Sequence, residues 1–594
     1  MMSFLTWCWS IARGALNAFA VIGVMLAVVL VGLAAVGLAS GDGLPRQIVL
    51  ALDLRKPMED RAPGNPFGFD EARTGVVDVV LGLDEATRDP RVKGVLLRVG
   101  TGGLGVAQAE ELGDALKRFR KSGKFVIAHS QGFFHPGLGD YLMAASADEI
   151  WMQPASFFFP AGAAATTIFY KGLFEKLEAE PQFVKRSEYK NAANVYMEKD
   201  FTPEHREATT HVLQSWYQGA TAAIAADRGM DGDVLKDFFE NAPATVEEVK
   251  AKGLIDEIGY DDDAKDRAVA RAGDDAEVVE FAKFAHAKRE ARQFEQGPKI
   301  AFVHAAGDIV DSPVDADPFG NDNIVAGDEY AEAIREATED EDIKAILIRV
   351  DSPGGSPTAS DQIRDAVAKA REAGKPIVVS MGSVAASGGY YLSLEADRIV
   401  AQPATLTGSI GVVWGKVAVG NTLNLVGLSA RQIGEGKNAL FVSGIEPWTP
   451  EQMADVNQQA DYIYKDFTTK VAEGRKLPIE KVQDLARGRV WTGTDAKERG
   501  LVDALGGLWT ALDATKELAG IDKETRAVLE VYPKPKGIFA VVARFFGTSI
   551  AGLQALSGLH VLMNAEPVRA LIEAVRAAPD GRAMMHAPGL PRRQ

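Results

Sequence analysis

The sequence predicts an α/β fold that occurs twice in tandem and follows an N-terminal transmembrane helix. Short runs of Val, Ile and Leu alternate with helical stretches such as 107–120 and 359–373. This alternation is typical of parallel strands joined by crossover helices. The same order of motifs then occurs a second time, and residues 15–39 carry no charge. With 594 residues, the chain is long enough for two such domains.

The uncharged segment 15–39 is the first predicted element. It exceeds the ~20 apolar residues that span a bilayer, whereas the apolar part of a cleaved signal peptide has only ~7–15. An uncleaved membrane anchor is therefore favoured over a cleaved leader or a buried core helix. Arg13 precedes the segment, so residues 1–14 are assigned to the cytoplasm and the bulk of the chain to the other side.

The two copies are predicted at residues 46–260 and 299–532, and their first strands at 48–54 and 300–305. Both copies contain Ala-Asp-x-Ile followed by Pro-Ala, and the two prolines lie 249 residues apart. The same spacing separates Leu138 from Ser387. One unit was therefore duplicated, and only the second copy carries a serine at this position.

Two further segments differ in composition from the copies. Residues 261–298 are dense in charge and alanine, which predicts a solvated helical connector. The tail, 533–594, contains a stretch at 537–562 rich in Phe, Val, Ala and Leu. That stretch fits an amphipathic helix lying on the membrane and equally a helix packed on the protein itself.

Charge and metal-binding residue types limit the partners. A net charge of −17 argues against nucleic acid, because binding phosphate requires a basic surface. The eight His and one Cys form no metal motif, and Cys8 precedes the anchor, so the rest of the chain cannot form a disulfide. We predict no cofactor and no metal.

Ser387 is the first candidate catalytic residue. It lies where a predicted strand ends and a helix begins near Gly388 and Gly389. Free backbone N–H groups and the positive end of the helix dipole can stabilise an oxyanion there. The commoner role for a lone serine at such a place is an N-cap.

A glycine loop favours the catalytic role. Asp351-Ser352-Pro353-Gly354-Gly355-Ser356 directly follows a predicted strand, and its N–H groups can point into a cleft. Alone, Pro-Gly-Gly is only a turn signal. Together with the loop at Ser387 it supplies two donors from two loops, which suits acyl transfer. The first copy has Gly100-Thr101-Gly102-Gly103 here and lacks the Ser-Pro.

A serine nucleophile also needs a base. The second copy contains only His304, so lysine is the alternative, provided that burial lowers its pKa. Lys190 and Lys437 occupy corresponding places, and each precedes a Thr-Pro-Glu that predicts a helix start. An exposed surface position is the commoner state of a lysine. On chemical grounds alone, the sequence does not show whether Lys190 or Lys437 is the base.

Three motifs together resemble signal peptide peptidase A in its long, duplicated bacterial form. They are Ser352-Pro353-Gly354-Gly355, Ala385-Ala386-Ser387-Gly388-Gly389-Tyr390 and Thr407-Gly408-Ser409-Ile410-Gly411-Val412. The resemblance extends over residues 48–511. It implies two tandem ClpP/crotonase-like spiral domains, built from repeated β-β-α turns.

The resemblance also implies a serine protease with a Ser-Lys dyad. The nucleophile corresponds to Ser387, and the base corresponds to Lys190 in the Tyr189-Lys190 segment of the first copy. Backbone N–H groups of Gly355 and Gly388 correspond to the oxyanion donors. Lys437 would then face Leu138, and a lysine there is not expected in the long form.

Substrates, assembly and location follow from the same resemblance. The implied substrates are signal peptides left in the membrane after cleavage, and the implied assembly is a homotetramer. The N-terminal helix would contact membrane lipid in the bacterial inner membrane, with the catalytic domains on the periplasmic side. The alternatives are a crotonase-like acyl-CoA enzyme, which needs neither Ser387 nor an anchor, and a non-catalytic membrane scaffold in which Ser387 only caps a helix.

Overall fold

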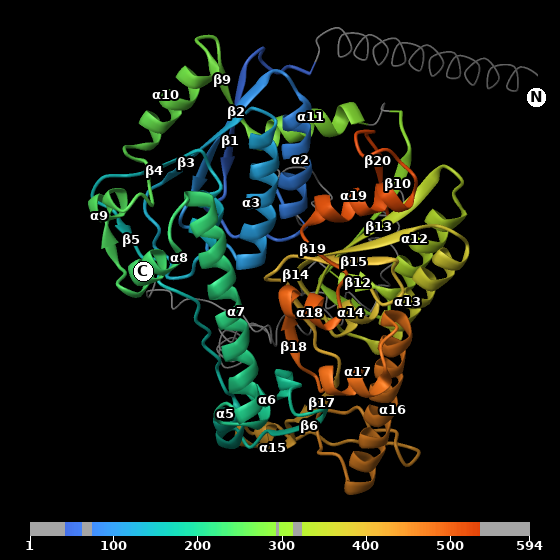
Figure 1. Cartoon of the computed structure of the whole chain (residues 1–594). Coiled ribbons are helices and arrows are strands. Elements are labelled where there is room, and N and C mark those ends of the chain that lie inside the picture. The colour runs from blue at the N-terminus through green and yellow to red at the C-terminus, as the bar shows by residue number, and fades with distance from the viewer. Residues whose placement is uncertain (1–41, 62–73, 293–295, 313–323, 535–594) are drawn as a thin grey trace, which may run out of the picture.

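The computed structural model contains two mainly parallel sheets, one from each copy, with helices packed around and between them (Figure 1). It describes residues 42–61, 74–292, 296–312 and 324–534. The predicted anchor 15–39 and the stretch 537–562 lie outside these residues. Within the described part, no helix is both long and apolar enough to cross a membrane. The predicted α/β class and the duplication are confirmed.

The first sheet has the order β8-β4-β3-β2-β1-β9, with all neighbours parallel. Its strands consist largely of Val, Ile, Leu and Phe because helices cover both faces. Their bounds are β1 Ile48–Asp53, β2 Val92–Val99, β3 Phe125–Ser130, β4 Glu149–Met152, β8 Glu257–Ile258 and β9 Glu277–Glu280.

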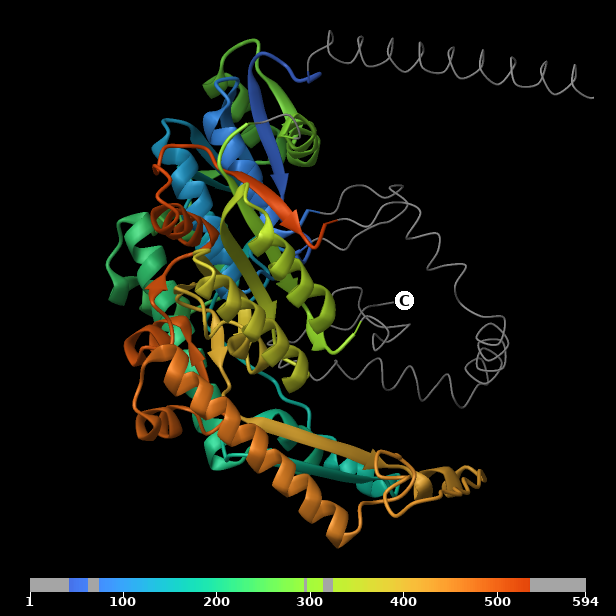
Figure 2. The same cartoon turned by 90° about the vertical axis from the view of Figure 1, so that its right-hand side faces the viewer.

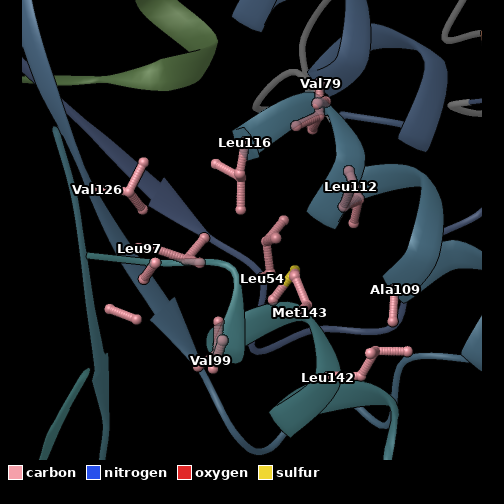
Figure 3. Packing of buried hydrophobic residues seen from close by; sticks show 14 of the residues in the cluster. Leu54, Val79, Leu97, Val99, Ala109, Leu112, Leu116, Val126, Leu142 and Met143 are labelled. Atoms are coloured by element: carbon pink, nitrogen blue, oxygen red, sulfur yellow. The ribbon is translucent and has the colours of Figure 1, made fainter. Parts of the chain in front are cut away.

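Helices α2 (Val76–Arg88), α3 (Val106–Lys121) and α4 (Gly139–Ala145) pack on one face of this sheet. Figure 3 shows Leu112 and Leu116 of α3, Met143 of α4 and Leu97 of β2 as members of one apolar cluster between the helices and the sheet. These side chains are at most 1% exposed. The first copy therefore has a complete core although it lacks a serine nucleophile.

The predicted connector, 261–298, is largely part of the first copy. Helix α10 (Asp261–Ala272) buries Ala264 and Ala268 against the second face of the sheet, and β9 pairs in parallel with β1. The predicted helix is present in α10, and most of its side chains are exposed, but the segment is not a mere connector, because α10 packs on the first sheet and β9 extends it. The small alanines, four residues apart, lie close to the strands without the large apolar side chains that would have indicated a core helix.

The second sheet has the order β18-β16-β14-β13-β10-β20, and β15 and β19 branch from β14. β14 pairs first with β15 and then, beyond Met381, with β16, while β13 shifts register between Val350 and Ser352. The bounds are β10 Lys299–Ala306, β13 Ile343–Ser352, β14 Ile377–Ala386, β15 Arg398–Ala401, β16 Leu406–Gly408, β18 Val490–Thr492, β19 Ala504–Leu505 and β20 Val528–Tyr532.

The second copy repeats the helices of the first. They are α12 Gly327–Glu339, α13 Pro357–Glu372, α14 Gly388–Tyr391, α18 Gly493–Arg499 and α19 Leu508–Leu518. The smaller elements of both copies are α5 Lys171–Lys176, a 3-10 turn Asn191–Ala193, α6 Asn194–Met197, α8 Gly232–Glu240, α9 Val246–Ala251, α11 Phe281–Arg292, α15 Gly420–Leu425, α17 Ile479–Leu485, β5 Phe157–Phe158, β7 Ala244–Thr245, β11 Asp308–Val310 and β12 Ile324–Ala326.

Each copy also contains one long helix, α7 (Pro203–Arg228) and α16 (Pro450–Arg475). Both begin at the predicted Thr-Pro-Glu, because Thr202 and Thr449 each accept a backbone N–H of the first turn. Beside them, β6 (Glu180–Arg186) of the first copy pairs antiparallel with β17 (Val412–Ala418) of the second. Figure 2 shows this ribbon, in teal and orange, as an arm at the foot of the molecule.

The two copies pack against each other through apolar side chains and a buried charge cluster. The apolar cluster that contains Leu112 also contains Leu347 and Val378 of the second sheet. Beside it, Arg349 of β13 forms ion pairs with Asp60 and Glu111 of the first copy, at 2.7 and 3.0 Å. The copies are thus packed as one body.

Candidate active site

Ser387 lies at the sharp bend between β14 and α14. Its φ is +52° and its ψ is −115°, a conformation that costs a non-glycine residue of order 1–3 kcal/mol and clusters at functional sites. Leu138, its counterpart, has an ordinary φ of −82°. A hydrogen bond of 2.8 Å from Ser387 N–H to Gly408 O holds the bend. The Ser387 side chain makes no helix-capping hydrogen bond.

The Ser387 hydroxyl instead contacts Lys190, which comes from the first copy. Lys190 Nζ lies 3.0 Å from Ser387 Oγ, and 2.9 Å from both Oγ and the backbone O of Ser409. Lys190 is only 4% exposed. Burial lowers its pKa to about 7, because the charged ammonium is poorly solvated there. Near neutral pH, much of Lys190 is therefore uncharged and able to accept a proton.

Ser409 is a contact residue that the sequence argument did not single out, although it lies within the Thr407–Val412 motif. Its φ is +50°, and its N–H donates to Arg489 O at 2.7 Å. Its two oxygens fix the direction of the Lys190 ammonium or amine. The unusual backbone of Ser409 is produced by tertiary contacts, so the motif alone did not predict this role.

Lys437, the other candidate base, has a different environment. Its side chain is 76% exposed and pairs with Glu451 at 2.9 Å. The hydrogen bond to Glu451 raises its pKa, so Lys437 is protonated at neutral pH. The structure thus brings Lys190, and not Lys437, to Ser387.

The glycine loop packs directly against the nucleophile bend. A methyl group on Gly354 would lie 2.7 Å from the Gly388 nitrogen and 2.9 Å from Ser387 Cβ. Gly354 N–H donates to Ser352 Oγ at 3.2 Å. Within the described residues, no hydrogen-bond acceptor is found for the N–H of Gly355 or Gly388. Both predicted oxyanion donors therefore keep their N–H groups available beside Ser387.

In the first copy, the glycine loop binds a carboxylate from the chain itself. Asp140 lies two residues after Leu138 and is 4% exposed. It accepts the N–H groups of Gly103 and Leu104 at 3.1 and 3.2 Å. The second copy has Gly389 at the position of Asp140. Sequence reasoning missed Asp140, because a lone Asp at a helix start usually indicates only a cap.

Comparisons with known proteins extend over both copies. The family model "Peptidase family S49" matches residues 118–274 and 369–522. "Serine protease SPPA, chloroplastic" of Arabidopsis thaliana is 31% identical, over 85% of this chain and 75% of that protein.

Two bacterial proteins are also similar. "Protease 4" of Salmonella typhi is 34% identical, over 74% of this chain and 72% of its own. "Putative signal peptide peptidase SppA" of Enterococcus faecium is 31% identical, over 43% of this chain and 73% of its own. The family match in both copies, together with these relatives, establishes that the chain belongs to peptidase family S49 and is a serine protease of the signal peptide peptidase A type.

Proposed function

We propose that this protease cleaves peptides with a Ser387–Lys190 dyad that the two copies build together. The observation that carries the proposal is the 3.0 Å contact between Lys190 Nζ and Ser387 Oγ in a buried setting. Neutral Lys190 takes the Ser387 proton as the hydroxyl oxygen attacks the peptide carbonyl. Protonated Lys190 then gives its proton to the leaving amine, and the regenerated amine activates the water that hydrolyses the acyl-enzyme.

Gly355 and Gly388 donate their N–H groups to the oxyanion of the tetrahedral intermediate. The first copy supports the assignment of Gly355, because its glycine loop binds the Asp140 carboxylate through the N–H groups of Gly103 and Leu104, and Leu104 corresponds to Gly355. The glycine loop can thus donate backbone N–H groups to a carboxyl oxygen. In the second copy, Gly389 stands at the position of Asp140 and has no side chain that could accept these N–H groups.

The dyad is tested with a fluorophosphonate probe and mass spectrometry on active membranes. We expect an adduct on Ser387, loss of peptide hydrolysis in Ser387→Ala and Lys190→Ala, and normal hydrolysis in Lys437→Ala. The loss in Lys190→Ala should reach at least about 10²–10⁴-fold in kcat. Absence of the Ser387 adduct would remove the dyad, and an inactive Lys437→Ala beside an active Lys190→Ala would transfer the base to Lys437.

The proposed substrates are signal peptides released into the bacterial inner membrane, cleaved by catalytic domains on its periplasmic side. The apolar segment 15–39 supports the membrane location, and the name of the Enterococcus faecium relative supports the substrate class. Added protease should degrade the catalytic domains in spheroplasts but not in intact cells. A synthetic signal peptide in vesicles should be cleaved by wild type and not by Ser387→Ala. If the domains resisted the added protease in spheroplasts as well as in intact cells, the periplasmic location would be contradicted.

We further propose a homo-oligomer, with the homotetramer as its expected form. The support is that the two copies form the β6–β17 strand pair but not the second pair that the duplication would allow. β6 of the first copy pairs with β17 of the second, but their repeat counterparts, residues 427–433 and 163–169, form no strand. Ile433 is 99% exposed and Ile168 is 51% exposed. A head-to-tail neighbour would pair these two segments as the chain pairs β6 with β17.

Disulfide trapping between two singly substituted proteins tests the assembly. In a Cys8→Ser background, Thr167→Cys protein mixed with Ser429→Cys protein should give disulfide-linked dimers, because Lys416 and Gln182, to which these positions correspond, are partners in the ribbon. In the control mixture, Lys236→Cys protein takes the place of Thr167→Cys protein. Lys236 lies on exposed α8, away from the ribbon, so this mixture should give no disulfide-linked dimers. Equal cross-linking in both mixtures, or none in either, would contradict this interface.

A further inference from the structure

We propose that Gly488, with its neighbours Arg487 and Arg489, is a positioning element that holds Lys190 against Ser387 and Ser409. The inference rests on the proposed dyad and assigns a role to a loop between α17 and β18 of the second copy. None of the three residues touches Ser387 in the contacts described above, so they act through Lys190. The loop contacts the Lys190 segment on one side and the Ser409 segment on the other.

On one side, the loop contacts the segment that carries the base. A methyl group on Gly488 would lie 2.5 Å from Lys190 Cβ and 2.6 Å from its backbone nitrogen. Tyr189 N–H donates to Arg487 O at 3.1 Å. Gly488 has a φ of +77°, a conformation that suits glycine. Only a residue without a side chain allows the lysine backbone to lie this close.

On the other side, the loop contacts the residues that direct the Lys190 amine. Ser409 N–H donates to Arg489 O at 2.7 Å, and Gly488 N–H donates to Ile410 O at 2.9 Å. The same three residues thus fix the backbone of the base and the backbone of its hydrogen-bond partner. Because these contacts join the two copies, the loop determines the distance between them at the active site.

Side chains of the loop hold the adjacent tyrosine. The guanidinium groups of Arg487 and Arg489 lie 5.3 and 4.9 Å from the centroid of the Tyr189 ring. Arg487 also pairs with Glu188, and Arg489 pairs with Glu207 at 2.8 Å. Each arginine is therefore paired with a glutamate of the first copy. These ion pairs hold both guanidinium groups next to the Tyr189 ring.

The first copy supplies an internal comparison. Thr245 and Thr492 cap corresponding helices and lie 247 residues apart, as Lys190 and Lys437 do. The counterpart of Gly488 is therefore Asn241, whose φ is −100°. Lys437, the lysine that corresponds to Lys190, is exposed and has no such loop beneath it. The left-handed glycine occurs only in the copy where a lysine docks.

Gly488→Ala tests the role in the full chain. The added methyl group should displace Lys190 from Ser387 and lower kcat by about 10²-fold with little change in KM, since ~1 Å of misplacement has this effect. Displacement toward solvent should also raise the pKa of Lys190. The acidic limb of the kcat/KM profile should then move to higher pH. A merely structural defect would reduce the amount of folded enzyme and leave that limb in place.

Gly253→Ala is the matched control, because Gly253 has the same φ of +77° but no atom within 4 Å of an added methyl group. It should keep wild-type kcat and the wild-type pH limb. If Gly488→Ala does not fold, Tyr189→Ala should move the limb in the same direction, and Tyr189→Phe should restore it. The inference would be overturned if the acidic limb of the kcat/KM profile stayed at its wild-type pH in folded Gly488→Ala or in Tyr189→Ala. Inactivity of Lys437→Ala with an active Lys190→Ala would instead overturn the dyad itself.

Discussion

At the scale of residues, the site depends on one polar contact between side chains 197 positions apart. Ser387 is held in a strained conformation by Gly408, and Lys190 is enclosed by the second copy. Burial has a direct chemical effect on the lysine. An exposed lysine is protonated at neutral pH and cannot accept the serine proton, whereas a buried one with a pKa near 7 can.

This pKa predicts the pH dependence of catalysis. Because only neutral Lys190 accepts the proton, kcat/KM should rise with pH through about 7 and fall about tenfold per pH unit well below it. The measurement is kcat/KM for a peptide substrate from pH 5 to 10. Lys437→Ala should give the same profile. An acidic limb near 10, as for a solvent-exposed lysine, would contradict the proposed base.

At the scale of elements, the β6–β17 ribbon delivers the base. β6 belongs to the first copy and ends at Arg186, four residues before Lys190, while its partner strand follows Ser409 in the second copy. Seven residue pairs are in register along the ribbon, from Val412↔Arg186 to Ala418↔Glu180. The pairing of these two strands therefore fixes how deeply the base segment enters the second copy.

Gly415→Ala tests this arrangement. A methyl group at Gly415 would lie 2.2 Å from the Phe183 ring and 2.5 Å from Gln182 O, so the strands must separate. We expect kcat to fall at least about tenfold, because the separation shifts Lys190. Gly444→Ala, in the same arm, meets only Val417 O at 3.4 Å and should retain activity. Full activity of Gly415→Ala would mean that the ribbon does not position the base.

At the scale of the whole molecule, the two copies are joined by a buried cluster of charges. Arg349 is 2% exposed and lies between Asp60 and Glu111, which are 4% and 3% exposed. His304 also contacts Asp60, at 2.8 Å. Arg349 and His304 hold the pKa of the Asp60 carboxyl well below its usual range. Removing one partner from such a cluster leaves a buried charge without full compensation.

Asp60→Asn should therefore lower the free energy of unfolding at pH 7 by about 3–5 kcal/mol, as measured by urea denaturation. A carboxyl with a lowered pKa stabilises the fold above its unfolded pKa of ~3.9 and loses that contribution as the pH falls below it. The difference between wild type and Asp60→Asn should accordingly shrink between pH 4 and pH 3. A constant difference over this range would show that Asp60 is not ionised in the folded protein.

The sequence by itself determined the repeated α/β fold, the strands that end near the active site, and two lysines as candidates for the base. These features follow from local patterns, because alternating apolar runs and glycine loops specify elements and bends. The ClpP/crotonase spiral remains a prediction from the family resemblance. The alanine-rich segment 261–298 was assigned as a mere connector, since its small side chains conceal a packed helix and strand.

The residue types alone left two lysines open and the family resemblance favoured Lys190, but only the tertiary structure shows Lys190 in contact with Ser387. Lys190 and Lys437 have similar sequence neighbours, but one is 4% exposed and the other is paired with Glu451 at the surface. Ser409, Gly488 and Asp140 likewise gain their contacts only from folding. A pKa and a hydrogen-bond direction depend on burial and on atoms that come from distant parts of the chain, so the local sequence does not contain them.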